Sequence, residues 1–298
     1  MRGIPPCGDP SLFGANPATA NLELSSRNSP ASGVSLPSEG GGKADGSPRG
    51  PSFRLACLPS ATSFAVVEAT EKNSETGSRE LATRIVATLQ SESPSFHGGG
   101  DEPAENLRIR YDVLEWVRDN VTPGMVTLET GCGYSSVVFA ACGAAHTSVS
   151  PAPTEHANVR AWCEQKGVPT SVLQFENGFS EVVLPGLGDA PIDLMLIDGM
   201  HAYPWPIIDF FFTADRIKVG GYLMIDDVSL RSGETLREFV VREEGRWRLV
   251  TDLKATTIFQ KLSAPSLRGL NWPEQPWGAK PVTRWKRRFR QLRQRFGG

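Results

Sequence analysis

The chain has 298 residues, and 31 Lys and Arg stand against 33 Asp and Glu, which gives a formal net charge of −2. This balance disfavours a protein that coats nucleic acid over its whole surface. The longest apolar runs fall far short of the ~20 residues that a membrane helix needs. Five scattered cysteines, without a Cys-x-x-Cys pair, indicate reduced thiols rather than a disulfide framework or zinc cluster. We therefore expect a globular, cytoplasmic protein.

The first part of the chain is rich in residues that resist regular structure. Residues 1–60 contain 9 Gly, 9 Pro and 10 Ser. Such a segment cannot bury enough apolar surface to offset the entropy of ordering it. We expect residues 1–75 to be a disordered extension. Two interpretations stay open: a transit peptide, or an extension from a misassigned start.

The middle of the chain, residues 76–262, alternates between two kinds of pattern. Apolar residues at helical spacing predict helices over 77–90 and 104–120. Five short β-rich runs then alternate with helical patterns; the runs are 125–130, 146–150, 171–177, 192–199 and 222–228, and the helical patterns are 135–143, 154–167, 179–187, 205–221 and 234–245. Two further runs, 247–253 and 256–262, lie close enough to form a hairpin.

This alternation predicts an α/β fold: a doubly wound, mostly parallel, seven-stranded Rossmann-like sheet with helices on both faces and a C-terminal β-hairpin. Such sheets bind ligands at the carboxyl ends of their strands, so candidate site residues are sought there.

The end of the chain, residues 263–298, consists of a Pro- and Trp-containing loop and a basic tail. Residues 281–298 hold seven Lys or Arg and no acid, with Trp285, Phe289, Leu292 and Phe296 at helical spacing. The pattern predicts a basic amphipathic helix. It either touches an anionic surface, lipid or nucleic acid, or docks on its own acidic domain or is simply solvated.

The first predicted strand leads into a glycine loop, Glu129-Thr130-Gly131-Cys132-Gly133-Tyr134-Ser135-Ser136. Gly131 and Gly133 allow a tight turn and a close approach by a ligand whose anionic group meets the following helix N-terminus. A dinucleotide site would need a third glycine where Ser136 stands, and an acid where Ser150 ends the second strand. Glu129 instead suits a ligand that carries a cationic amine beside an anionic group, as an amino acid does.

Two later strand ends carry a second group of polar residues. Asp198 and His201 follow one strand, and Asp226 and Asp227 follow the next. Three carboxylates at one edge of a sheet repel one another unless a cation or a positive substrate lies between them. Their oxygens suit Mg²⁺ or Mn²⁺ better than zinc.

The motifs ETGCGYSS, DGMHAYPWPIIDFF and VGGYLMIDD, in this order, resemble the class I S-adenosylmethionine-dependent methyltransferases. The match is to the branch with a D-G-x-H-x-Y and G-G-x-x-x-D-D pattern, which includes small-molecule O-methyltransferases, and it covers residues 104–262. The resemblance implies that Glu129 contacts the methionine amino group, directly or through water. The other residues that it implies near the cofactor are Gly131, Gly133, Tyr134, Ser135, Ser150, Gly178, Phe179 and Asp198.

The resemblance further implies that Asp198, Asp226 and Asp227 are metal ligands and that Asp198 and His201 are catalytic, His201 as the base. Ser150 departs from the pattern, because the family has there an acid that binds the ribose hydroxyls. A serine makes a neutral hydrogen bond instead, which costs ~1–2 kcal/mol of cofactor affinity.

The sequence therefore predicts an S-adenosylmethionine-dependent methyltransferase that acts on a hydroxyl of a small molecule, with Mg²⁺ lowering the pKa of that hydroxyl. The alternative is a non-catalytic protein that binds the cofactor or a partner on the same fold. A hydrolase ranks last, because no G-x-S-x-G elbow is present and Cys132 lies inside the glycine loop. A homo-oligomer stays open.

Overall fold

The computed structural model describes residues 61–97, 108–265, 267–270 and 275–278. All of them belong to one unit, Leu58–Gly298. The predictions for residues 1–60 and for the basic tail lie outside the described residues and stay predictions.

The chain alternates between helices and strands as predicted. After α1 (Ala61–Glu92) and α2 (Tyr111–Asn120), the elements are β1 (Val126–Thr130), α3 (Tyr134–Ala141), β2 (Ala145–Ser150), α4 (Pro153–Lys166), β3 (Leu173–Asn177), α5 (Ser180–Val183), the 3-10 turn η2 (Leu184–Leu187), β4 (Ile192–Ile197), α6 (Trp205–Thr213), β5 (Ile217–Ile225), α7 (Arg231–Arg242), β6 (Trp247–Leu253) and β7 (Thr256–Lys261).

The seven strands form one sheet in the order β3-β2-β1-β4-β5-β7-β6. Strands β1 to β5 run parallel to one another, and β7 pairs antiparallel with both β5 and β6. The order reverses direction between β1 and β4, which is where a doubly wound sheet opens a crevice for a ligand. The predicted fold class, including the C-terminal hairpin, is confirmed.

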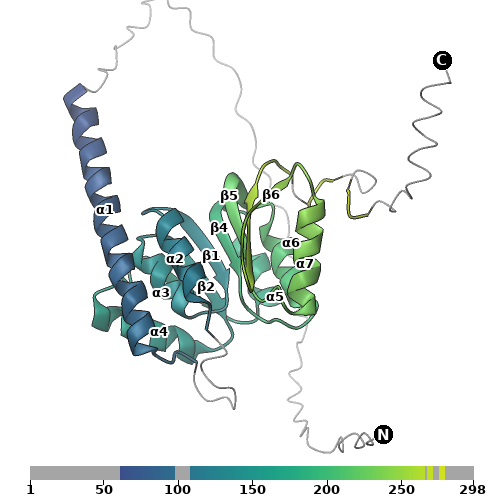
Figure 1. Ribbon diagram of the computed structural model, residues 1–298, viewed down its shortest axis with the longest axis horizontal. Coiled ribbons are helices and arrows are strands. Elements are labelled where there is room, and N and C mark those ends of the chain that lie inside the picture. The colour runs from purple at the N-terminus through teal and green to yellow at the C-terminus, as the bar shows by residue number, and fades with distance from the viewer. Residues whose placement is uncertain (1–60, 98–107, 266, 271–274, 279–298) are drawn as a thin grey trace, which may run out of the picture. The chain divides into compact units, whose positions relative to one another are not determined.

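Helices cover both faces of the sheet (Figure 1). Helices α1 to α4 pack on one face over a cluster that includes Phe139 and Trp162, and α6 and α7 pack on the other over a cluster that includes Phe210 and Trp247. The central strands contribute apolar side chains to both clusters, because successive residues of a strand point to opposite faces.

The first helix is longer than predicted, since α1 begins at Ala61 rather than at residue 77. Residues 61–75, which we expected to be disordered, are therefore helical. Ala82, Ile85, Val86 and Leu89 are buried at helical spacing, and α1 packs against α2 and α3. This packing stabilises the second half of the helix, whereas the side chains described just before it, residues 74–80, are mostly exposed.

Two other element boundaries were wrong. The helix predicted over 104–120 begins at Tyr111; residues 108–110 precede it and 104–107 lie outside the described residues. The helix predicted over 205–221 ends at Thr213, and Ile217 already belongs to β5. The register of β5 shifts against β4, and a Cβ at Gly221 would lie 2.7 Å from the Asp193 carbonyl oxygen. A glycine in this irregular strand therefore allows close packing against β4, and the helical pattern of the sequence did not predict it.

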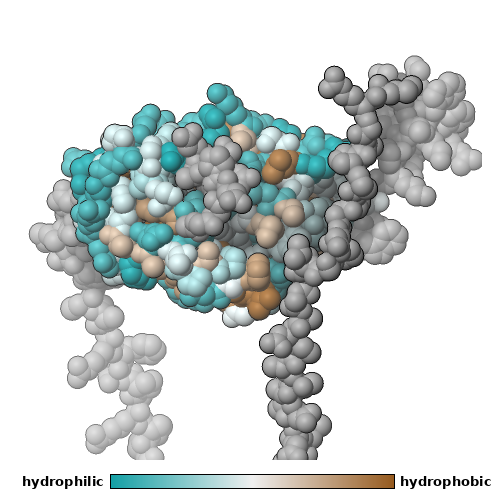
Figure 2. All heavy atoms as spheres, turned by 90° about the horizontal axis from the view of Figure 1, so that it is seen from below, coloured by the Kyte–Doolittle hydropathy of each residue, from teal (hydrophilic) through white to brown (hydrophobic). Residues whose placement is uncertain are grey.

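The described surface is mixed in character. Figure 2 shows hydrophilic residues over much of the coloured part of one face, with small apolar groups between them. Within the described ranges, no helix has the length and apolar character that crossing a membrane requires.

Candidate active site

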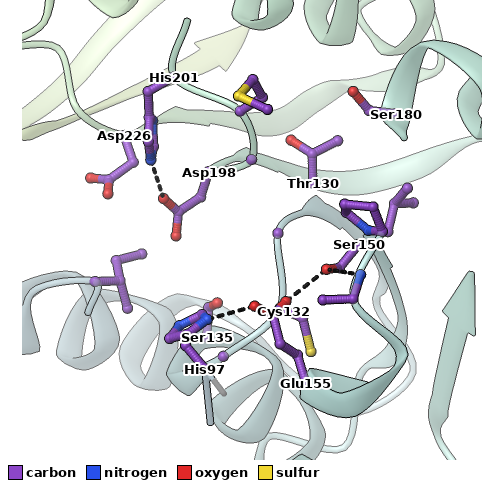
Figure 3. A pocket seen from close by; sticks show the side chains of 18 of the residues that line it. His97, Thr130, Cys132, Ser135, Ser150, Glu155, Ser180, Asp198, His201 and Asp226 are labelled. Carbon is purple, nitrogen blue, oxygen red and sulfur yellow. Dashed lines mark hydrogen bonds and ion pairs between the residues drawn. The ribbon is translucent and has the colours of Figure 1, made fainter. Parts of the chain in front are cut away.

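A cavity of about 370 Å³ lies at the carboxyl ends of β1, β2, β4 and β5. This volume is within the range of small-molecule and cofactor sites. Of the residues predicted from sequence, those that line it are Gly131, Gly133, Tyr134, Ser135, Ser150, Phe179, Asp198, His201, Asp226 and Asp227. Figure 3 shows how side chains from several separate segments converge on it.

Residues 131–133 of the glycine loop form part of the cavity wall. Gly131 has φ +101°, and a Cβ there would lie 2.3 Å from the Asp198 carbonyl oxygen. Only glycine fits this close contact between two strand ends. Helix α3 begins at Tyr134, so its N-terminal end meets the cavity that Gly133, Tyr134 and Ser135 line. A helix N-terminus in this position suits an anionic group of a ligand.

Glu129 does not line the cavity, contrary to the prediction. Its carboxylate is buried beneath the loop, where Oε1 accepts hydrogen bonds from the Ser136 hydroxyl and from His146 Nε2, at 3.0 Å in the second case. His146 in turn bonds Thr127 through Nδ1 at 2.8 Å and stacks on Phe139. Oε1 is thus engaged within the protein, whereas Oε2 is buried without a hydrogen-bond partner among the described residues, and the predicted contact with a ligand amino group stays a prediction.

Gly178 also lies off the cavity. It has φ +150°, and a Cβ there would lie 2.8 Å from Val183 Cγ2, so its role is to turn the chain from β3 into α5. The neighbouring Phe179 and Ser180 do line the cavity, and the Phe179 side chain is half-exposed. An exposed aromatic ring at a cavity wall is suited to stacking on a flat ligand.

One side of the cavity is acidic. His201 Nε2 lies 3.3 Å from Asp227 Oδ2 and 4.0 Å from Asp198 Oδ1. Burial and the neighbouring carboxylate of Asp226 raise the pKa of Asp198 well above its ordinary value. Burial likewise raises the pKa of Asp226, although the Thr256 hydroxyl donates a hydrogen bond to it. This cluster therefore favours a positive charge in the cavity.

The predicted magnesium site is not supported. Among the described residues, no three or more His, Cys, Asp or Glu side chains are arranged to hold a metal ion. Asp226 is engaged by Thr256, and Asp227 faces His201. Asp198 and Asp226 are therefore neighbours, but together with Asp227 they do not form the kind of site that a hard cation needs.

The opposite side of the cavity carries residues that sequence reasoning missed. Glu155, at the start of α4, accepts hydrogen bonds from Ser150 and His97 (Figure 3). Arg108 lies over the Tyr134 ring, and its Nε is buried with no hydrogen-bond partner in the described part of the chain. The sequence contained one signal for Glu155, its position as an acid in the first turn of α4, but an acid there is also typical of an ordinary helix start. His97 and Arg108 had no local signal at all.

The cavity also contains Cys132, but its thiol is not reactive. Burial, with a smaller contribution from the charge of Glu129, raises the pKa of Cys132 to about 12. The thiol is therefore protonated at neutral pH and is a poor nucleophile. Cys132, Cys142 and Cys163 are all buried free thiols.

Residues 128–228 match a family model described as a methyltransferase domain. The match runs from β1 to the residues just after β5, and so contains the glycine loop and the acidic side of the cavity. No curated protein sequence matches the chain.

Similar solved structures include a methyltransferase from Podospora anserina bound to S-adenosylhomocysteine (18% identity, 70% of this chain and 100% of that chain, TM-score 0.45). Another is the O-methyltransferase TomG from Streptomyces achromogenes, in complex with S-adenosylmethionine (15% identity, 62% and 90%, TM-score 0.43). A third is an rRNA methylase from Streptococcus thermophilus (13% identity, 50% and 93%, TM-score 0.40).

Residues 128–228 thus combine a match to a methyltransferase domain with a doubly wound sheet and a cavity at its strand ends.

Proposed function

We propose that this protein is an S-adenosylmethionine-dependent methyltransferase that acts on a hydroxyl of a small molecule. The observation that carries the proposal is a cavity where a glycine loop, a helix N-terminus and an acidic cluster meet, within the segment that matches a methyltransferase domain. These features suit the parts of the cofactor: an amino-acid carboxylate, a positive sulfonium and a nucleoside.

The residues of the cavity fit this cofactor by their chemistry. The N-terminal end of α3 and the guanidinium of Arg108 would hold the carboxylate, because both are positive and both border the cavity. Asp198 and Asp226 would stabilise the sulfonium charge. Phe179 would cover the adenine.

When bound, the cofactor supplies a methyl group that is already activated for displacement by its sulfonium. The protein's tasks are then to align the acceptor and to remove its proton. His201 lines the cavity and would accept this proton. Asp227, 3.3 Å away, orients the imidazole and stabilises the charge that it gains. The proposed reaction uses no metal ion, because among the described residues the three carboxylates do not form a site for one.

A calorimetric titration of S-adenosylmethionine and S-adenosylhomocysteine into the full chain tests the proposal. We expect micromolar binding of both, and then turnover with members of a panel of hydroxylated small molecules. No binding at millimolar ligand in a folded sample would contradict a methyltransferase. Binding without turnover on any acceptor, hydroxylated small molecules or RNA, would favour the non-catalytic alternative. Turnover on RNA alone would keep the enzyme and overturn its substrate class.

A further inference from the structure

Ser150, the last residue of β2, has a neutral side chain at a place where doubly wound folds commonly carry an acid for ribose hydroxyls. Its Oγ donates a hydrogen bond of 2.7 Å to Oε2 of Glu155 and accepts one of 3.2 Å from the Ala152 amide. The hydroxyl has one proton, and its hydrogen bond to Glu155 takes that proton. Ser150 is therefore suited to orienting Glu155 rather than to forming hydrogen bonds with a ligand itself.

A second group fixes the other oxygen of the same carboxylate. His97 Nδ1 lies 2.8 Å from Glu155 Oε1. His97 is itself held in place, because Tyr134 donates a hydrogen bond to the Pro94 carbonyl and Asn158 donates one to the Phe96 carbonyl. The Phe96 ring also packs edge-on against Tyr134 and Trp162. The segment after α1 is therefore anchored on α3 and α4, with His97 at the cavity.

The Glu155 carboxylate is ionised in this arrangement. Burial alone would raise its pKa, but the hydrogen bonds from His97 and Ser150 hold the pKa below its ordinary value. The side chain is 18% exposed and lines the cavity. Each oxygen accepts one protein hydrogen bond and keeps a further acceptor position. Two such oxygens on one carboxylate match the two donors of a vicinal diol.

We infer that Glu155 is the diol-binding carboxylate of this site, moved five residues from the end of β2 into the first turn of α4, with Ser150 and His97 as its positioning residues. The ligand group is the pair of ribose hydroxyls of an adenine nucleoside. This inference rests on the proposed function. It also accounts for how a chain with Ser150 keeps a charge-assisted contact to the ribose.

The test compares Glu155→Gln with the wild type in the full chain, by titration with S-adenosylhomocysteine. We expect the variant to bind about 10-fold to 100-fold more weakly, as for the loss of hydrogen bonds to a charged group. Glu164→Gln is the matched control, because Glu164 lies on the same helix but is exposed and does not line the cavity. Circular dichroism establishes that each variant is folded.

Two further measurements separate diol binding from a structural role of Glu155 in anchoring the segment after α1. With S-adenosylhomocysteine that lacks its 2′- and 3′-hydroxyls, wild type and Glu155→Gln should bind equally weakly. The double variant Ser150→Asp/Glu155→Gln, which returns a carboxylate to the end of β2, should recover most of the lost affinity for the natural nucleoside.

Equal binding of S-adenosylhomocysteine by Glu155→Gln and the wild type would overturn this inference and leave the proposed function intact. The inference would also be overturned if Glu155→Gln lost affinity equally for natural S-adenosylhomocysteine and for the form without ribose hydroxyls, since a structural role alone gives that result. A wild type that binds neither nucleoside would overturn both.

Discussion

Asp209 on α6 is wholly buried, and neither carboxylate oxygen has a hydrogen-bond partner among the described residues. Burial raises its pKa to about 6, although the nearby hydroxyls of Ser180 and Thr130 oppose the rise. Both hydroxyl residues line the cavity, so Asp209 lies just behind the cavity wall. A buried group of this kind costs stability whenever it is ionised.

We predict that Asp209→Asn becomes more stable relative to the wild type as the pH rises. The folded wild type binds the proton more tightly than the unfolded chain, whose Asp has a pKa of 3.8, so wild-type stability is lost between about pH 4 and pH 6. The difference in unfolding free energy between variant and wild type should grow by about 2–3 kcal/mol across this window. Urea unfolding at pH 4, 5, 6 and 7 measures it, and a difference that does not vary with pH would contradict the assignment.

His201 is predicted to act in turnover rather than in cofactor binding. His201→Gln should lower kcat by about 100-fold, as for the loss of a general base, while the Kd for S-adenosylmethionine changes less than 3-fold. Asp227→Asn should lower kcat less, because it removes only the group that orients the imidazole. Stopped-flow or steady-state assays on one accepted substrate separate the two parameters. A variant with full kcat would remove His201 from the mechanism.

At the scale of elements, the two glycines of the loop after β1 do different work. Gly131 combines a positive φ with the 2.3 Å approach to Asp198, whereas Gly133 is extended and a Cβ there would make an ordinary 3.7 Å contact with His97 Nε2. We therefore expect Gly131→Ala to lower the unfolding free energy by about 2–4 kcal/mol. Gly133→Ala should fold normally and weaken cofactor binding instead. Equal stabilities of the two variants by thermal unfolding would refute this division.

The order and type of the elements were predictable because each buried strand and each amphipathic helix has a local period. The start of α1 and the start of β5 were not. The side chains described just before the buried face of α1 are mostly exposed, so no apolar period marks this part of the helix, and β5 depends on a glycine in close contact with β4. Boundaries set by tertiary contacts leave little trace in a local pattern.

The site shows the same division. The strand-end position of Asp198, Asp226 and the glycine loop follows from topology, so the sequence located the cavity. Topology does not determine to which side a strand-end residue points: Glu129 lies beneath the loop with His146, while its neighbour Thr130 reaches the cavity. Glu155 and His97 come from separate elements, and only the folded chain brings them together.

For the whole molecule, ligand binding and stability are linked. S-adenosylhomocysteine at 100 times its Kd should raise the unfolding free energy by about 2.7 kcal/mol. For a domain of this size the melting temperature should then rise by about 5–10 °C. EDTA should leave this shift unchanged, because Asp198, Asp226 and Asp227 do not form a metal site. Differential scanning fluorimetry measures both, and a shift abolished by EDTA would restore a metal ion to the site.

The edge strand β6 has a consequence for pairing between separate copies of the chain. β6 lies at one end of the strand order, so one side of its backbone has no neighbour among the strands that the structure describes. Its register against β7 shifts between Leu249 and Thr251, where Leu249 and Val250 are 47% and 40% exposed. A bulge twists such an edge and breaks the regular spacing of its free amide and carbonyl groups, and the adjacent Arg248 adds charge. An exposed apolar edge is thereby kept from serving as a template for fibrous aggregation.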